Sequence, residues 1–443
     1  MKKFFTYPVF VVLFLSFIGV MGFGAIVKYN YDGGKKYHLL QKIAMFIVET
    51  PFRIKKIIDM KSLDLNSVEK LSKHKNKLNF KQFIENKRNA LLVLPRYDHY
   101  LKRSLVEIVD LNNFKTIHTY MHDIDEMNKQ INNSKEFPRL NIDNSEKRFL
   151  YQHPLIFDDG TLTGIGGPAY KLDFCSNILW INDEEYFHHS QMIDHEGNIW
   201  TGGYMNPKSK LVRNFLSEKS EKLSDDSIVK IDNGGKILFN KSVLEILDEN
   251  NIIIDNYSSR YDPIHLNDIE PTFSDTDYWK KGDLFLNIRT QDMIVHYRPS
   301  NNRVINIIRG PFTWAHDVDV ISDKEISIFN NNNNTTNSDH SEIIIYNFEK
   351  KKFRRLFNRQ LKKENFKTIT EGLHHIFKDG SLMVEEQNHG RIILLNNQGE
   401  KEWEYINKDD NEDIGYITWS RVIENELFIK NFKLMVKNKQ CSN

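Results

Sequence analysis

The stretch that decides the fold is HSQMIDHEGNIWTGGY, residues 189–204. One short apolar run ends at the turn sequence DHEG, residues 194–197, and a second apolar run follows it. A Glu-Gly or Asp-Gly pair between two such runs is typical of a β-hairpin. The segment therefore predicts two antiparallel strands joined by a tight turn.

The same pattern recurs along the chain, as QHPLIFDDGTLTGIGG (152–167), HDVDVISDKEISIFNN (316–331), GLHHIFKDGSLMVEEQ (372–387) and, after an insertion, KKGDLFLNIRTQDMIVHY (280–297). Further strand pairs, such as 341–356 and 390–405, complete the units. Repeats of this size with about four strands each are typical of β-propeller blades.

We therefore expect an all-β domain over residues 88–436, a six-bladed β-propeller with seven blades as the fallback. The expected blades are residues 88–120, 151–187, 188–247, 264–311, 315–357 and 370–407. The last segment, 416–430, reads as one or two strands that complete the first blade and close the ring. A flat sandwich is less favoured, because the units share a motif and not merely a strand length.

Residues 1–30 are predicted to anchor the protein in a membrane. Phe4 to Val27 carries no charge and is long enough to span a bilayer as a transmembrane helix. Lys2 and Lys3 precede it, so the positive-inside rule places the propeller on the extracytoplasmic, periplasmic side. A cleaved signal peptide is the alternative, although the apolar run is longer than usual and no clear cleavage site follows.

Residues 31–87 are predicted to be a helical or linker segment. Within it, 38–60 shows helical spacing with flanking basic residues, which fits either an amphipathic helix on the membrane surface or a helix packed on the domain. Residues 61–87 read as a polar linker or a surface helix.

Composition excludes several classes of protein. The chain has 61 Lys and Arg against 60 Asp and Glu, a balance that argues against nucleic-acid binding. Two cysteines, Cys175 and Cys441, exclude a four-cysteine metal site, and we expect both to be free thiols because Cys441 lies near the end of the chain. No feature indicates the oligomeric state.

The repeat register places histidines at one position. His189 and His316 each lie eight residues before the turn position of their units, and His265 begins its own unit. The innermost strands of a propeller line its central channel, so three imidazoles from three blades are expected to converge on the axis. Gln152 and Gly372 occupy the same position elsewhere, so folding does not require His there.

Arg289 follows an apolar strand, where a guanidinium either pairs with a carboxylate or clamps an anionic ligand. Phe312 and Trp314 lie just before His316 and are expected to form an aromatic wall beside that histidine. His374 and His375 are out of register and are expected to be structural.

Four motifs in this order resemble the bacterial arylsulfate sulfotransferase family, namely FHHSQMIDHEGNIW, IHLNDIEPTF, GDLFLNIRTQDMIVHY and RGPFTWAHDVDV. The resemblance covers residues 88–430. It implies a six-bladed enzyme outside the cytoplasm that moves a sulfuryl group from an aryl sulfate to a phenol, by a ping-pong mechanism without a nucleotide sulfate donor. By position, His316 resembles the nucleophile that becomes sulfohistidine, and His189, His265 and Arg289 resemble its partners. No metal and no organic cofactor is expected.

Two other functions remain open from the sequence. The chain fits a non-enzymatic, membrane-tethered propeller that binds a ligand or a partner, because one fold hosts many functions. It also fits a hydrolase in which the three histidines hold zinc with one open position, although Arg289 beside a cation is unfavourable.

Overall fold

The computed structural model describes residues 6–31, 43, 73–132, 145–146, 148–215, 223–254, 262–332 and 340–441. The chain divides into two compact units, residues 1–68 and 69–443. The second unit begins earlier than the expected residue 88, because the segment after residue 73 packs on the last sheet, as described below.

The first unit contains the helix α1 (Thr6–Tyr31), where a helix was expected. Its described apolar side chains are exposed, for example Leu13 and Phe17 with 63% of their surface accessible. No helix among the described residues is both long and apolar enough to cross a membrane. The amphipathic helix expected at 38–60 lies outside the described residues, apart from residue 43.

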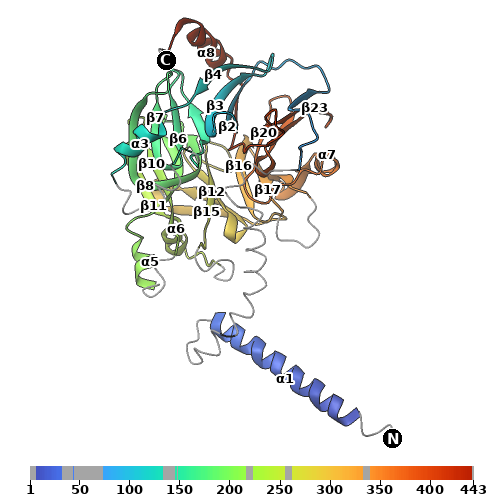
Figure 1. Ribbon diagram of the computed structural model, residues 1–443. Coiled ribbons are helices and arrows are strands. Elements are labelled where there is room, and N and C mark those ends of the chain that lie inside the picture. The colour runs from blue at the N-terminus through green and yellow to red at the C-terminus, as the bar shows by residue number, and fades with distance from the viewer. Residues whose placement is uncertain are drawn as a thin grey trace. The chain divides into compact units, whose positions relative to one another are not determined.

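The second unit is mostly antiparallel sheet in a propeller-like arrangement (Figure 1). In spatial order, the first sheet holds β24 (Arg421–Ile423), β2 (Leu91–Asp98), β3 (Arg103–Asp110) and β4 (Lys115–Tyr120). The third holds β12 (Leu266–Pro271), β13 (Leu284–Ile288), β14 (Met293–Arg298) and β15 (Arg303–Ile308). The fourth holds β16 (Ala315–Ser322), β17 (Glu325–Asn330), β18 (Glu342–Asn347) and β19 (Lys352–Leu356). The last holds β20 (Leu373–Ile376), β21 (Leu382–Glu386), β22 (Arg391–Leu395), β23 (Lys401–Ile406) and β1 (Phe80–Gln82).

The second sheet has seven strands and contains two of the expected blades. In order it holds β5 (Gln152–Ile156), β6 (Leu162–Ile165), β7 (Gly167–Leu172), β8 (Ile178–Ile193), β9 (Ile199–Tyr204), β10 (Asp226–Ile231) and β11 (Ile237–Ser242). The strand β8 is 16 residues long, so its first half pairs mainly with β7 and its second half with β9. The four other sheets match the four remaining expected blades.

Short helices lie at the margins of the sheets. They are α3 (Ile124–Gln130), α5 (Lys210–Phe215), α6 (Val243–Glu249), α7 (Asn358–Lys363), α8 (Glu426–Asn438) and the 3₁₀ turns η3 (Arg289–Gln291), η4 (Pro299–Asn301) and η5 (Gln387–His389).

Neighbouring sheets meet through their inner strands and through apolar faces. The inner strand β5 contacts β8, β8 contacts β12, β12 contacts β16, and β16 contacts β20. The last and first sheets share an apolar cluster that includes Ile392 and Leu92, and β24 contacts β5, which returns the series to its beginning. Between the fourth and the last sheet, for example, Phe329 and Ile343 pack with Val384 and Ile393, all fully buried. Side chains at alternate positions of a strand point to the same face of the sheet, so apolar residues at these positions form the faces that pack together.

The C-terminal segment closes the ring, as expected. β24 pairs antiparallel with β2, with Leu91 opposite Ile423 and Val93 opposite Arg421. Of the one or two strands expected there, the structure forms one, because Asn425 then begins the helix α8 by accepting a hydrogen bond from the Phe428 amide at 3.0 Å.

The segment before residue 88 joins the last sheet. β1 pairs with β23 at the outer edge, so the expectation of a linker or helix is wrong for residues 80–82. Nearby, His74 Nε2 lies 2.9 Å from the carboxylate of Glu386, which also accepts from Arg391 Nε at 2.6 Å. Glu386 and Arg391 are fully buried, so these bonds replace lost hydration.

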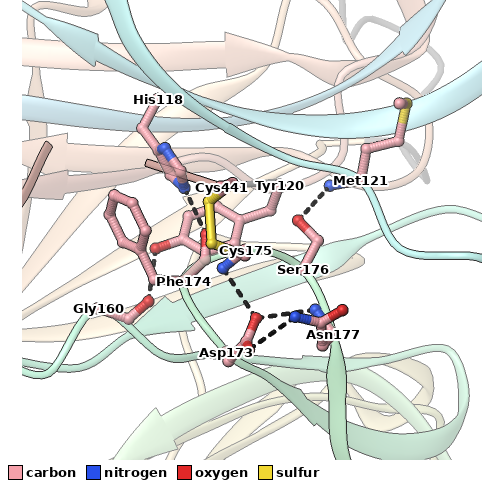
Figure 2. The surroundings of a disulfide bond; sticks show 10 residues. All are labelled: His118, Tyr120, Met121, Gly160, Asp173, Phe174, Cys175, Ser176, Asn177 and Cys441. Atoms are coloured by element: carbon pink, nitrogen blue, oxygen red, sulfur yellow. Dashed lines mark hydrogen bonds between the residues drawn. A yellow bond between two sulfur atoms is a disulfide. The ribbon is translucent and has the colours of Figure 1, made fainter. Parts of the chain in front are cut away.

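The expectation of two free thiols is wrong, because Cys175 and Cys441 form a disulfide (Figure 2). The end of the chain is held in place because α8 buries Ile429 and Phe432 in the apolar cluster of the first two sheets. The Asp173 carboxylate accepts from the Cys175 amide at 2.8 Å. The bond links residues 266 positions apart and so ties the last helix to the seven-stranded sheet.

We predict that Cys441→Ser destabilises the second unit. A crosslink between distant residues restricts the unfolded chain, and its loss typically costs about 2–4 kcal/mol of unfolding free energy. Guanidinium unfolding of the full chain measures this loss. Dithiothreitol should destabilise the wild type by a similar amount and leave Cys441→Ser unchanged. Equal stability of the wild type with and without the reductant would contradict the disulfide's role.

Candidate active site

The four residues singled out from the sequence lie together at one end of the inner strands. The ring of His189 lies 5.1 Å from that of His265 and 5.9 Å from that of His316, between ring centres. Arg289 Nη1 lies 2.8 Å from His265 Nε2. The structure therefore brings all four side chains into one cluster, supplied by β8, the residue before β12, η3 and β16. Their roles in catalysis stay a prediction.

A left-handed backbone residue recurs at this end of the inner strands. These residues are His153, His189, His265, Trp314, Glu371 and Trp419, with φ between 43° and 65°. Such a conformation costs roughly 1–2 kcal/mol for a non-glycine residue, and it tends to occur at functional sites. The left-handed conformation turns the side chain away from the direction that a regular strand would give it. Large side chains therefore lie next to one another near the axis.

His265 orients Arg289 through a chain of polar contacts. The Asp262 carboxylate is hydrogen-bonded to His265 Nδ1 and also accepts from the His265 amide at 3.1 Å. This contact assigns the proton of a neutral imidazole to Nδ1, so Nε2 is free to accept from Arg289. Burial alone would raise the pKa of Asp262, but the hydrogen bond and charge of His265 lower it overall.

Arg289 is held without a direct ion pair to any described carboxylate. Its guanidinium carbon lies 4.2 Å from the centre of the Trp314 ring, a cation–π contact. Burial lowers the pKa of Arg289, while the charges of Glu371 and Asp262 oppose this effect. A guanidinium positioned in this way keeps donors available for an anion such as a sulfate group.

His316 is a buried, neutral imidazole, with 2% of its surface exposed. Its ring packs against Trp419 with a centre distance of 4.7 Å, and Nε2 lies 3.9 Å from the Glu371 carboxylate. Burial, followed by the charge of Arg289, holds the pKa of His316 well below its ordinary value. The same two causes, together with the neighbouring histidines, lower the pKa of His189.

The choice of His189 over its neighbour His188 agrees with the geometry. His188 is stacked on Tyr204 at 4.1 Å, and its Nε2 lies 3.5 Å from the Asp226 carboxylate. His188 and His189 contact each other through their Nδ1 atoms at 2.5 Å. His188 therefore packs against His189 at the edge of the cluster, whereas His189 contacts the rings of His265 and His316.

Sequence reasoning missed three residues of the site, Asp262, Glu371 and Trp419. Glu371 accepts a hydrogen bond from Gln387 at 3.2 Å, and burial raises the pKa of its carboxyl group. Its position immediately before Gly372, at the histidine position of the repeat, was a signal that could have found it. Trp419 precedes β24 and reaches His316 only because the ring is closed.

The expected aromatic wall is wrong for Phe312. That side chain is 2% exposed and packs in the apolar cluster between the third and fourth sheets. Trp314 does lie at the site, beneath the guanidinium of Arg289.

Farther along β12 and β16 lies an acidic layer, which consists of Asp268, Glu270, Asp317 and Asp319. Among the described residues, the group whose possible metal-ligating atoms all lie within 4.8 Å of one another is Asp317, Asp319 and His374, not the three histidines considered for zinc. Asp268 and Glu270 of β12 adjoin it. Burial raises the pKa of Asp268, Asp317 and Asp319 to about 7, and the charge of Asp317 adds to this effect at Asp268 and Asp319. His374 is bonded to Asp317 and to Ser327, each at 2.7 Å.

The fold and this cluster define a propeller-like protein with imidazoles and one guanidinium at the end of its inner strands. The sequence model of the arylsulfotransferase (ASST) family matches residues 149–408, more than half of the chain, and the chain belongs to that family. This makes it a sulfotransferase in general terms, with small-molecule donors and acceptors. The matched range contains His189, His265, Arg289, His316 and Glu371, whereas Trp419 lies outside it.

Solved structures resemble the chain only distantly. A Bacteroides caccae protein of unknown function is 11% identical, with a TM-score of 0.47, over 76% of this chain and 100% of its own. A catalytically inactive virginiamycin B lyase from Staphylococcus aureus, solved with quinupristin, is 12% identical, with a TM-score of 0.33, over 57% of this chain and 69% of its own. No curated protein sequence matches significantly. These structures carry no argument about function.

Proposed function

We propose that the protein transfers a sulfuryl group from an aryl sulfate to a phenolic acceptor by a ping-pong mechanism, with no nucleotide sulfate donor and no cofactor. The observation that carries the proposal is a buried, neutral His316 in one cluster with Arg289 and two further histidines. A neutral imidazole is a competent nucleophile, and it leaves readily again.

In the first half-reaction, a nitrogen lone pair of His316 attacks the sulfur of the aryl sulfate. The bond between sulfur and the aryl oxygen breaks, and its electron pair leaves with the phenolate. In the second half-reaction, the acceptor phenol oxygen attacks the sulfur of sulfohistidine and the nitrogen–sulfur bond breaks, which restores neutral His316. As in phosphoryl transfer, catalysis then rests on alignment and on stabilising charge at the non-bridging oxygens.

Arg289 is proposed to hold those oxygens, and His265 to position Arg289. The hydrogen bonds of His265 run to Asp262 on one side and to Arg289 on the other, so this imidazole fixes the guanidinium. His189, in contact with both other rings, is proposed to donate to a sulfate oxygen. Preorganised donors of this kind supply a few kcal/mol of transition-state stabilisation each.

Glu371 is proposed as the group that moves the proton. It lies 3.9 Å from His316 Nε2, and 36% of its side chain is exposed toward solvent. Its raised pKa favours the protonated form that a leaving phenolate needs, and the resulting carboxylate accepts the proton of the incoming phenol.

The fold is proposed to be a six-bladed propeller in which β8 serves two blades. Two observations support this count. Each half of β8 pairs with a different neighbouring strand, which makes two four-stranded units of the seven-stranded sheet. The left-handed residues near the axis also number six, one for each unit.

The protein is also proposed to be held at a membrane by residues 1–30, with the propeller on the extracytoplasmic side. The uncharged run from Phe4 to Val27 after two lysines supports this orientation. The Cys175–Cys441 disulfide supports an oxidising compartment.

We expect the full chain to remain in the membrane pellet after carbonate extraction, and its propeller to be digested by protease added to bacterial spheroplasts. Deletion of residues 1–30 should abolish export. A full chain that is recovered in the soluble fraction and resists protease until the cells are lysed would contradict the proposed location.

We predict that His316→Ala abolishes transfer. Intact-mass spectrometry of the full chain mixed with 4-nitrophenyl sulfate should show the gain of one SO₃ group on the wild type and none on His316→Ala. Added phenol should remove the adduct and accelerate nitrophenol release. The matched control is His195→Ala, a histidine on the turn between β8 and β9, which should behave as the wild type. An adduct of equal occupancy on His316→Ala would exclude this nucleophile.

Glu371→Gln separates proton transfer from nucleophilic attack. Phenyl sulfate has a poor leaving group that needs the proton, so its turnover should fall about 10²–10⁴-fold. The first half-reaction with 4-nitrophenyl sulfate, whose phenolate leaves unaided, should slow less than about tenfold, measured as nitrophenol release in a single turnover. Glu126→Gln on the exposed surface of α3 is the control. Equal losses with both donors would assign Glu371 a structural role instead.

A further inference from the structure

Two neighbouring inner strands direct acidic residues at alternate positions toward one place. β12 carries Asp268 and Glu270, and β16 carries Asp317 and Asp319; alternate residues of a strand share one face. The Val318 amide donates to Asp268 at 3.0 Å, and the Val320 amide donates to Glu270 at 3.3 Å. Because each donor flanks Asp319 along β16, the four carboxylates are neighbours.

Glu270 has an oxygen that no described residue satisfies. The residue is 7% exposed, and its Oε1 accepts from Val320. Its Oε2 has no hydrogen-bond partner within the described part of the chain. Because Oε1 accepts from the amide of the residue next to Asp319, the unpartnered oxygen lies beside the acidic side chains of β16. A buried carboxylate oxygen in this state needs a positively charged or hydrogen-bonding partner.

The basic side chains around the cluster satisfy only some of its carboxylate oxygens. Arg421 of β24 interacts electrostatically with all four carboxylates, but it donates hydrogen bonds to the backbone oxygens of Pro154 and Gln191. His374 of β20 uses its nitrogens on Asp317 and Ser327. His375 on the same strand is directed to Glu424 at 3.2 Å. One guanidinium cannot pair with four carboxylates, so the layer offers more carboxylate oxygens than its basic neighbours satisfy.

The acidic layer is not sealed from solvent. The Asp319 side chain retains 32% of its accessible surface, while Asp317 retains 5%. A hydrated ion therefore has a route to the carboxylate oxygens, and ligand exchange does not require unfolding.

Asp317 and Asp319 already hold carboxylate oxygens within 4.8 Å of each other. We propose that this layer binds a hard divalent cation, with Ca²⁺ as the best fit, through Asp317 and Asp319, and that the neighbouring side chains of Asp268 and Glu270 move onto the ion as it binds. Oxygen-only ligands in a flexible arrangement are those that Ca²⁺ prefers, and Mg²⁺ takes fewer carboxylates. The site adjoins the histidine cluster but uses none of its side chains, and the proposal does not rest on the sulfuryl transfer. By joining β12 to β16, the ion fixes the strand that follows His265 and the strand that carries His316.

The test uses the full chain, purified and stripped with a chelator. Equilibrium dialysis against Ca²⁺, Mg²⁺ and Mn²⁺, read by elemental analysis, should show one tightly bound ion per chain, with Ca²⁺ bound most tightly. Saturating Ca²⁺ should raise the Tm by a few degrees, as expected for a ligand that binds only the folded state. Glu270→Gln and Asp319→Asn should each weaken binding by at least about tenfold. Glu126→Gln should bind as the wild type.

Two results would overturn the proposal. One is a wild-type chain that binds none of the three ions and whose Tm they leave unchanged. The other is Glu270→Gln with unchanged affinity. If Glu270→Gln fails to fold, the more exposed Asp319→Asn and the wild-type titration still decide the matter. His316→Ala should bind the ion normally, so a failure of the transferase mechanism and a failure of the cation site give different results.

Discussion

The pairing of β24 with β2 is the constraint on which the rest of the second unit depends. It joins residues from the two ends of the sheet series and leaves β24 as the inner strand of the first sheet. The inner strands remain the end strands of their sheets, and closure places β24 against β5. Two further links strengthen the closure, since β1 extends the last sheet and the disulfide fixes the end of α8.

Closure also builds the active site, because its residues come from separate sheets. His189, Arg289 and His316 lie on three different sheets, and Trp419 comes from the segment that completes the ring. Distances of about 5 Å between their rings therefore report the positions of whole sheets and not local chain geometry. A small shift at the closing strand would move Trp419 away from His316 and loosen the packing that orients the imidazole.

The histidine cluster and the acidic layer follow each other along β12 and β16, and they differ in the kind of ionisable group that they contain. At one end, burial and Arg289 keep His189 and His316 neutral, which leaves their lone pairs available. Next to it, β12 and β16 supply carboxylates in excess. Asp317 follows His316 directly, so whatever neutralises the acidic layer also bears on the position of that histidine. Because the histidine cluster and the acidic layer are adjacent, the charge of the acidic layer affects both the position of His316 and the electrostatic environment of its ring.

Local sequence determined the strands, the turns and the position of the histidines within the repeat, because hairpin turns and apolar alternation are short-range signals. The residues His189, His265, Arg289 and His316 could be selected in this way, and so could closure by the C-terminal segment. Tertiary structure alone decided that Cys175 meets Cys441, that Phe312 is core, that β8 serves two neighbours, and that Glu371 and Trp419 reach His316. These contacts join residues far apart in the chain, and they depend on how sheets pack round one axis, which no local pattern encodes.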